Sequence, residues 1–403
     1  MPYTYTHGSG TENDPYQVWT AADLDGVRDH LSSYFIQMDD IDLSGIAIAP
    51  IGHPSSNFTG RYNGNNFNIS NLDMNYLGES SPEGFDIGLF RRVFSGKITN
   101  VRLVNAVVKG SVRVGSLAGT VTGDAEHPEW GGVDAPGIIE NCSSVNTSCT
   151  GHYMVGGLVG SAGQSAKIGK SFATGEVIHE YGAAFANGIV GGFVGYLDAW
   201  EVWKYEIENC YARCSVGTNS PYDETNFGGF VGNTWNDSVS AYIKNCYATG
   251  SVTDQTWDGS HGGFCGREQG DYSAGISNSY YDSETSGMSD TGKGEPRTTA
   301  QMVYPYSAKH ASGTYVDWEF EEKHITDLTG YDFVFGVPWL HDHDASVNGG
   351  YPILFRPEIL FAVYSKIVAA WTSGPAWIKK DGQWKSVTDG WIKEGGAWKP
   401  IVP

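Results

Sequence analysis

Gly156-Gly157-Leu158-Val159-Gly160 is the clearest copy of a phrase that recurs along the middle of this 403-residue chain. The phrase returns as Gly191-Gly192-Phe193-Val194-Gly195, Gly228-Gly229-Phe230-Val231-Gly232 and Gly262-Gly263-Phe264-Cys265-Gly266, at intervals of 35, 37 and 34 residues. A weaker copy, Gly115-Ser116-Leu117-Ala118-Gly119, precedes them. A repeat of this period indicates one supersecondary unit stacked many times. The sequence therefore predicts an all-β solenoid in which each coil packs only on its neighbours.

A second phrase, of the form Ile-x-Asn-Cys, follows the glycine phrases. It occurs at 139–142, 207–210 and 243–246. Coils stacked about 4.8 Å apart would align its residues in ladders. We expect the asparagines of this phrase to stack at a bend, and its cysteines to form one inward column that Ser171 interrupts. Cys210 and Cys246 would come close enough for a disulfide, but free thiols are favoured because parallel ladders suit disulfide geometry poorly.

The ends of the repeat array differ from its middle. Residues 20–31 predict a short helix with Leu24, Val27 and Leu31 on one face and Thr20 as its N-cap, placed to cover the first coil. We divide the chain into an N-terminal cap (1–34), a β-helix (35–290), a C-terminal capping and linker region (291–370) and a Trp-rich module (371–403).

Composition excludes several classes of partner. The formal charge of −21 argues against nucleic acid, and no apolar run reaches the roughly 20 residues of a membrane helix. The first residues lack a basic stretch followed by an apolar core, so we expect no secretory signal. No cofactor-binding motif is present, and a homo-oligomer is one open arrangement.

The two phrases together resemble the GLUG repeat of bacterial surface adhesins. The segments around Pro50-Ile51-Gly52 and Phe58-Thr59-Gly60 resemble the part that precedes such repeats, and Gly350-Tyr351-Pro352-Ile353-Leu354 resembles the part that follows. The resemblance covers roughly residues 8 to 355. It implies a right-handed parallel β-helix and leaves the function open.

The last 30 residues contain a different repeat, in which Trp377 and Trp391, Trp384 and Trp398, and Lys385 and Lys399 are each 14 apart. Each half predicts a β-hairpin, with turns at 381–382 and 395–396. Isolated hairpins are marginally stable, so we expect these six residues to anchor the chain to another protein. Such Trp/Lys phrases resemble short modules of tailed-bacteriophage virion proteins. The alternative is a small Trp-rich domain that closes the last coil.

Loops of variable length separate the phrases and carry four tryptophans, at Trp200, Trp203, Trp235 and Trp257. Tryptophan is unusual in exposed loops, so these residues either pack the loops or form a recognition surface for a host-surface glycan.

Residues that suggest chemistry are few. His341-Asp342-His343-Asp344 and Asp39, Asp40 and Asp42 have metal-ligand side chains, but their positions favour a loop and a strand-to-turn segment, so we expect no metal site. No repeated carboxylate pair marks a catalytic groove, and we expect the chain not to be an enzyme.

Three functions compete. The missing export signal and the anchoring tail favour a bacteriophage virion protein, a tail spike or fibre or a head decoration protein, which assembles in the host cytoplasm and binds other virion proteins through residues 371–403. The alternatives are a bacterial cell-surface adhesin, which suits the GLUG resemblance, and a polysaccharide-degrading β-helix enzyme.

Overall fold

The computed structural model describes most of the chain. The residues outside the description are 1, 79–84, 125–134, 183–186, 201–203, 220–224, 239, 254–259, 274, 306–312, 321–337, 343–344, 346, 355–376, 381–382, 387–390, 395–396 and 401–403. Two compact units are present, one of residues 1–322 with 333–354 and one of residues 323–332 with 355–403.

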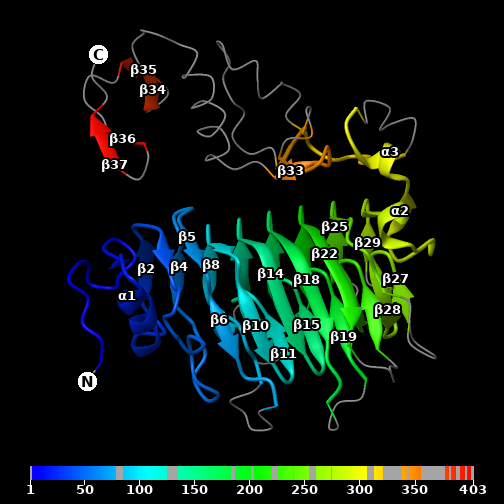
Figure 1. The fold of residues 1–403 in the computed structure, drawn as a ribbon, viewed down its shortest axis with the longest axis horizontal. Helices are drawn as coiled ribbons and strands as arrows, with labels where there is room; N and C mark the ends of the chain where they lie inside the picture. Colours follow the sequence, from blue (N-terminus) through cyan, green and yellow to red (C-terminus); the bar gives the residue numbers. More distant parts are fainter. Residues whose placement is uncertain are drawn as a thin grey trace. The chain divides into compact units, whose positions relative to one another are not determined.

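The first unit is a parallel β-helix, which confirms the predicted fold class (Figure 1). Each full coil contributes one strand to each of four parallel sheets, which we number I to IV in the order the chain visits them. Sheet I consists of β11 (Arg113–Gly115), β15 (Met154–Gly156), β19 (Ile189–Gly191), β23 (Asn226–Gly228) and β27 (His261–Gly262). Sheet II consists of β7 (Phe90–Phe94), β12 (Ala118–Thr122), β16 (Val159–Gly163), β20 (Val194–Ala199), β24 (Val231–Asn236) and β28 (Cys265–Gln269).

Sheets III and IV extend closer to the N-terminus. Sheet III consists of β1 (Tyr16–Val18), β2 (Tyr34–Gln37), β4 (Arg61–Asn63), β8 (Lys97–Thr99), β13 (Gly137–Glu140), β17 (Ala166–Gly169), β21 (Tyr205–Glu208), β25 (Tyr242–Lys244) and β29 (Ile276–Ser277). Sheet IV consists of β3 (Ile41–Asp42), β5 (Asn68–Ser70), β6 (Asp73–Asn75), β9 (Arg102–Val104), β10 (Val107–Gly110), β14 (Ser143–Gly151), β18 (Phe172–His179), β22 (Tyr211–Thr218), β26 (Tyr247–Ala248), β30 (Tyr280–Asp282) and β31 (Glu295–Arg297).

Both repeated phrases form corners between sheets. The glycine phrase joins a sheet I strand to a sheet II strand, and Ile-x-Asn-Cys joins sheet III to sheet IV. A Cβ on Gly157 would overlap the carbonyl oxygen of Gly192 in the next coil, and a Cβ on Gly192 would overlap that of Gly229. These glycines are therefore required by close backbone approach between coils rather than by positive φ.

The predicted asparagine bend is present. Asn141, Asn209 and Asn245 have φ of 54°, 55° and 53°, a left-handed conformation that asparagine adopts more readily than most residues. The Asn141 amide donates to Asn100 Oδ1 at 2.7 Å, as in a ladder. Lys170 occupies the same bend in the coil that lacks asparagine, with φ of 48°.

The cysteine column is buried and its thiols are free. Cys142 and Cys210 donate through Sγ to the carbonyl two residues earlier, at 3.3 Å in both coils. Ser171 Oγ makes the same bond at 2.7 Å. Either residue type fits this column, because both supply one small donor to the equivalent corner carbonyl.

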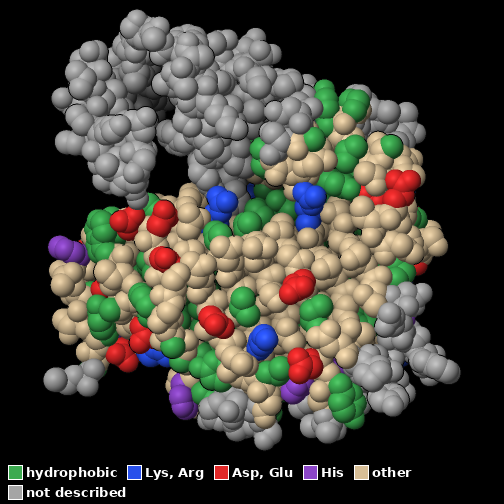
Figure 2. All heavy atoms as spheres, viewed as in Figure 1, with side chains coloured by type: hydrophobic (Ala, Val, Ile, Leu, Met, Phe, Trp, Pro, Cys, Tyr) green, Lys and Arg blue, Asp and Glu red, His purple; other side chains and the backbone are tan. Residues whose placement is uncertain are grey.

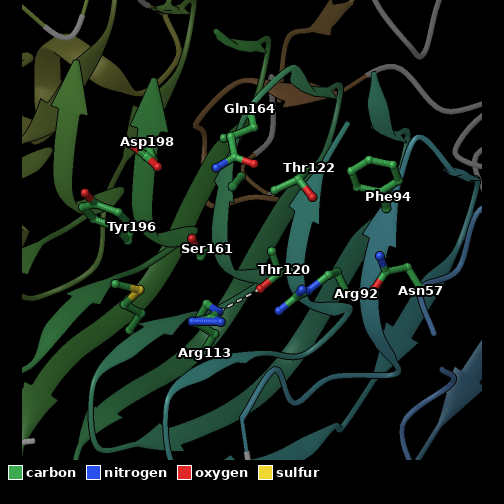
Figure 3. Close-up of a pocket in the computed structure, with 13 residues that line it drawn as sticks. Asn57, Arg92, Phe94, Arg113, Thr120, Thr122, Ser161, Gln164, Tyr196 and Asp198 are labelled. Carbon is green, nitrogen blue, oxygen red and sulfur yellow. Dashed lines mark hydrogen bonds between the residues drawn. The ribbon is translucent and has the colours of Figure 1, made fainter. Parts of the chain in front are cut away.

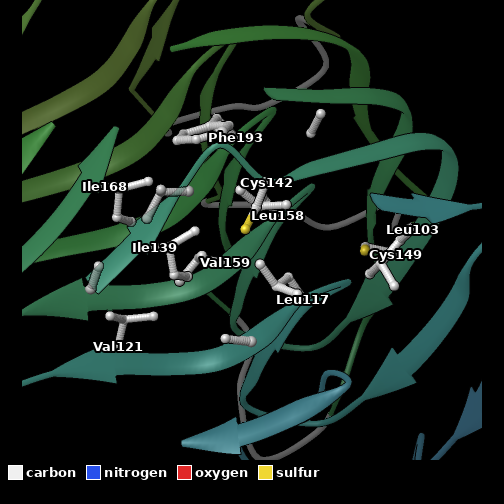
Figure 4. Close-up of a cluster of buried hydrophobic side chains, with 14 of the residues drawn as sticks. Leu103, Leu117, Val121, Ile139, Cys142, Cys149, Leu158, Val159, Ile168 and Phe193 are labelled. Atoms are coloured by element: carbon white, nitrogen blue, oxygen red, sulfur yellow. The ribbon is translucent and has the colours of Figure 1, made fainter. Parts of the chain in front are cut away.

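The core is a stack of equivalent apolar residues, part of which is shown in Figure 4. In the glycine corners, Leu117 and Leu158 are followed by Phe193, Phe230 and Phe264, all fully buried. The three phenylalanine rings stack with centroids 4.8 and 4.7 Å apart. Such offset stacking adds to the free energy of simple apolar burial.

A second apolar cluster covers the outside of sheet IV. Tyr211 and Tyr247 stack on that face, with centroids 4.9 Å apart, and Trp339 packs against both. Trp339 also donates through Nε1 to Asn209 Oδ1 at 3.0 Å. The covering segment contains α3 (Thr299–Met302), β32 (Trp339–Leu340) and β33 (Ile353–Leu354). This segment therefore buries a ladder of tyrosines that lies on the outer face of sheet IV.

The predicted N-terminal helix is shorter than expected. Helix α1 (Ala21–Gly26) gives way to a 3-10 turn, η1 (Val27–Asp29), and Thr20 with Asp23 forms a capping box. Near the other end, α2 (Ser283–Ser286) is capped by Asp282. No helix among the residues described combines the length and apolar character needed to cross a membrane.

The described part of the second unit is a pair of antiparallel hairpins, as predicted. They are β34 (Trp377–Lys380) with β35 (Gln383–Ser386), and β36 (Trp391–Glu394) with β37 (Ala397–Pro400). The register places Trp377 opposite Ser386 and Trp384 opposite Lys379, so the two tryptophan positions are diagonal rather than directly opposite. The anchoring role of Trp377, Trp384, Trp391, Trp398, Lys385 and Lys399 stays a prediction.

Candidate functional site

Two columns of residues line up where sheets I and II meet, one across five coils and the other across four. We call these two columns the groove. The sheet II column is Thr120, Ser161, Tyr196, Asn233 and Arg267, each in register with the next. The sheet I column is Arg113, Met154, Ile189 and Asn226, also in register. Two cavities follow one another along these columns.

The first cavity, which we call the arginine cavity, has a volume of about 380 Å³ and is shown in Figure 3. Beside it, Arg92 Nη2 and Arg113 Nε bind the buried carboxylate of Asp86 at 2.7 and 2.5 Å. Burial alone would raise the pKa of Asp86, but Arg113, Thr120 and Arg92 together hold that pKa below its usual value. The two guanidinium groups are thus neutralised in part by an internal partner.

A second carboxyl group lines the same cavity. Asp198 lies on β20, and burial, followed by the negative charge of Asp237, raises its pKa. Asp237 itself accepts a hydrogen bond from Trp235 Nε1 at 2.8 Å. A carboxyl group with a raised pKa keeps its proton to a higher pH than an exposed one does.

The second cavity, which we call the amide cavity, has a volume of about 500 Å³. Its lining includes Asn187, Asn226, Asn233, Gln269, Ser260 and Arg267. Both volumes fall in the range of natural ligand sites, about 300–1,000 Å³. Neutral hydrogen-bonding groups dominate the lining of this cavity, in contrast to the ion pairs beside the arginine cavity.

The structure describes two of the four tryptophans proposed from the sequence as a recognition surface. Trp200 directly follows β20 and is 58% exposed, and Trp235 is 40% exposed and lies in register with Asp198. Tyr272, on the following coil, is 49% exposed. Trp203 and Trp257 lie outside the described residues. A binding role for all four tryptophans stays a prediction.

Sequence reasoning missed Tyr196, Asp198, Asn233 and Arg267. A signal for the sheet II column was present, because each of its members directly follows the last glycine of a glycine phrase. The residue types in this column differ from coil to coil, so they do not form part of any repeated phrase.

The candidate metal ligands that the structure describes have structural partners. Asp342 is buried and accepts from the backbone amides of Asn348 and Gly350 at 2.7 and 2.9 Å. The His341 ring stacks on Phe320, and His343 and Asp344 lie outside the described residues. Asp42 Oδ1 accepts from Asn71 and from Ser44, which lowers the pKa of Asp42. Asp40 Oδ1 accepts from the Asn68 backbone amide, and Asp39 Oδ1 from that of Asp40.

The surface view shows a face of mostly uncharged atoms, with acidic and basic side chains placed singly over the β-helix (Figure 2). The net charge of −21 is therefore not gathered into one patch on this face.

Comparison with known proteins supports the repeat. Residues 223–253 match the GLUG motif. The chain is 29% identical, over 373 residues, to a protein of Evansella cellulosilytica provisionally named a Gly-rich membrane protein, with 74% of this chain and 42% of that one covered. It is 26% identical, over 178 residues, to the immunoglobulin A1 protease of Streptococcus pneumoniae, with 44% of this chain and 8% of the protease covered. The chain thus spans less than half the length of these two relatives.

A crystal structure from Bacteroides ovatus, provisionally assigned as an immunoglobulin A1 protease, has a similar arrangement. The TM-score is 0.47 and the identity 20%, with 66% of this chain and 87% of that chain covered.

One sequence-based prediction is overturned by these relatives. We expected the chain not to be an enzyme because it lacks a repeated carboxylate pair, but a sequence relative is named as a protease. A missing linear motif does not exclude catalysis in a β-helix, because an active site can be assembled from separate coils. None of the three names denotes a virion component.

Proposed function

We propose that this chain is the β-helical binding region of a bacterial surface-associated protein of adhesin type, and that its groove binds an extended cell-surface glycan. The groove is the observation that carries the proposal. Its sheet II column runs across five coils, and steps of about 4.8 Å between coils give a length of about 19 Å. A surface of this shape suits a linear ligand lying along the axis of the β-helix.

The chemistry of the groove supports a saccharide. The hydroxyl group of Ser161 and the amide of Asn233 can exchange hydrogen bonds with sugar hydroxyls. Tyr196 and, at the edge of the groove, Trp235 offer aromatic faces on adjacent coils, and such faces pack against the apolar faces of sugar rings.

The relatives support a location at a cell surface, since one of them is named a membrane protein. The virion role predicted from the tail is the second candidate, and the relatives reported above do not favour it. In either role the same groove would face the ligand, while residues 371–403 would serve attachment only in the virion.

Glycan binding tests the proposal. The purified chain is screened on an array of bacterial and host glycans, and the affinity for the best ligand is measured by titration calorimetry. Replacing one aromatic contact, as in Trp235→Ala, is expected to weaken binding about tenfold, which corresponds to about 1.4 kcal/mol. Tyr196→Ala combined with Trp235→Ala is expected to abolish binding.

Trp19→Ala is the matched control, because Trp19 is 42% exposed, close to the 40% of Trp235, and lies beside the N-terminal helix. It should bind as the unmodified chain does. Binding that survives the double replacement, or no binding to any glycan class, would refute the proposal.

A further inference from the structure

The amide cavity differs from the arginine cavity in whether its arginine is held in an ion pair by the described residues. Arg267 lies on β28, is exposed, and forms no ion pair with any of the described residues. Arg92 and Arg113 at the other end of the groove are both engaged by Asp86. An unpaired guanidinium in a protein of net charge −21 is a group that a ligand anion can still neutralise.

Among the residues that the structure describes, no carboxylate lines the amide cavity beside Arg267. A cation among neutral amides favours a bound anion, because the amides add hydrogen bonds without competing for the charge. The planar fork of a guanidinium matches a carboxylate, with two parallel N–H···O bonds. The cavity thus has a complete donor set for one carboxylate group.

A buried acceptor in the same cavity lacks a partner. Asn233 is 3% exposed, and its Nδ2 donates to Gln269 Oε1 at 2.9 Å. Its Oδ1 is buried and has no hydrogen-bond partner in the described part of the chain. Buried polar atoms are rarely left unpaired, so this oxygen points to a ligand that brings a hydroxyl or N–H donor.

A third group is oriented by the fold. Asn226 Oδ1 accepts from the backbone amide of Ser260 at 3.2 Å, which leaves the Nδ2 of Asn226 as the end available to a ligand. Asn226 and Asn233 belong to the strands on either side of one glycine corner, β23 and β24. The cavity therefore combines a cation that can bind an anion (Arg267), a hydrogen-bond acceptor (Asn233 Oδ1) and an oriented amide donor (Asn226 Nδ2).

We infer that the amide cavity is a subsite for a carboxylate-bearing sugar unit, with Arg267 binding the carboxylate and Asn233 Oδ1 accepting from a hydroxyl of the same unit. The inference rests on the proposed glycan-binding function and names the class of glycan. An acidic peptide could also bind Arg267 and donate a backbone N–H to Asn233, so the test compares it directly with the sugar.

The test compares three probes on the full chain. They are a tetramer of galacturonic acid, the same tetramer with its carboxyl groups reduced to give galactose units, and a glutamate tetrapeptide. The unmodified chain is expected to bind the acidic tetramer at least tenfold more tightly than the reduced one, and added salt should shrink that preference. Tighter binding of the peptide than of the acidic tetramer would overturn the assignment to a sugar.

Two replacements locate the effect. Arg267→Gln should weaken binding of the acidic tetramer at least tenfold and leave the reduced tetramer unchanged, whereas Asn233→Ala should weaken both. Lys109→Gln is the matched loss of one positive charge, on β10 away from the groove, and should change neither. If Arg267→Gln binds both tetramers as the unmodified chain does, the inference is wrong.

The proposed glycan-binding function and the carboxylate subsite can be refuted by different results. Aromatic-dependent binding of neutral glycans, with no preference for the acidic tetramer, would refute this subsite and leave the proposed function intact. The absence of any glycan binding would refute both.

Discussion

Replacing Phe230 with alanine tests the stacked core most directly. Phe230 is fully buried, and its ring lies between those of Phe193 and Phe264, with centroids 4.8 and 4.7 Å away. Truncation of a buried phenylalanine to alanine costs about 3–5 kcal/mol. Both stacking contacts are lost as well, so we expect a value near the upper end, about 4–5 kcal/mol.

Urea unfolding followed by circular dichroism measures the change in the free energy of unfolding. Because each coil contacts only its neighbours, hydrogen–deuterium exchange should show lost protection in the coils of Phe193, Phe230 and Phe264, while β4 and β8 keep theirs.

Phe230→Leu is the matched variant, because Leu117 and Leu158 hold the equivalent position in earlier coils. We expect it to cost less than about 1.5 kcal/mol. Trp200→Ala, at an exposed site, should stay within about 0.5 kcal/mol of the unmodified chain. A loss below about 2 kcal/mol for Phe230→Ala, or protection lost evenly along the chain, would refute the stacked-coil reasoning.

Three further outcomes are expected. Gly192→Ala should prevent soluble folding because its Cβ would overlap a carbonyl oxygen of the next coil, whereas Gly169→Ala, whose nearest neighbouring atom would lie 3.7 Å away, should express and melt normally. The pKa of Asp86 is lower in the folded chain than its ordinary value of 3.8, so Asp86 stabilises the fold above pH 3.8 and this stabilisation is lost as the pH falls through the folded pKa. Acid unfolding of Asp86→Asn should therefore depend less on pH in that range. An unchanged pH profile would contradict the assigned ion pairs. All six cysteines are buried, and burial raises the pKa of Cys149 to about 12, so a thiol reagent at pH 8 should label none of them quickly before urea is added and all six afterwards.

Recurring residues made the fold predictable. Glycine, asparagine and cysteine return at fixed places in the phrases, and each recurrence corresponds to a physical need at a corner: close approach at Gly157, a left-handed bend at Asn141 and a small donor at Cys142. The phrases lie at the corners of each coil. They mark the bends between strands, because a bend restricts residue type more tightly than a strand does.

The groove and the tyrosine ladder were not predictable in the same way. Tyr196, Asn233 and Arg267 occupy one column, yet they share no residue type, since packing inside the stack does not restrict these positions. Tyr211 packs on Trp339, which lies 128 positions later in the sequence. Contacts at such a separation leave no local pattern.

The corner geometry has a consequence for the length of this molecule. Gly191 and Gly228 end neighbouring strands of sheet I in matching register, so removing residues 192–228 would join two equivalent points and leave every remaining junction unaltered. The protein can therefore grow or shorten only in whole turns. Each such change would lengthen or shorten the groove by one step of about 4.8 Å. The number of coils would therefore set the length of ligand that the proposed site could hold.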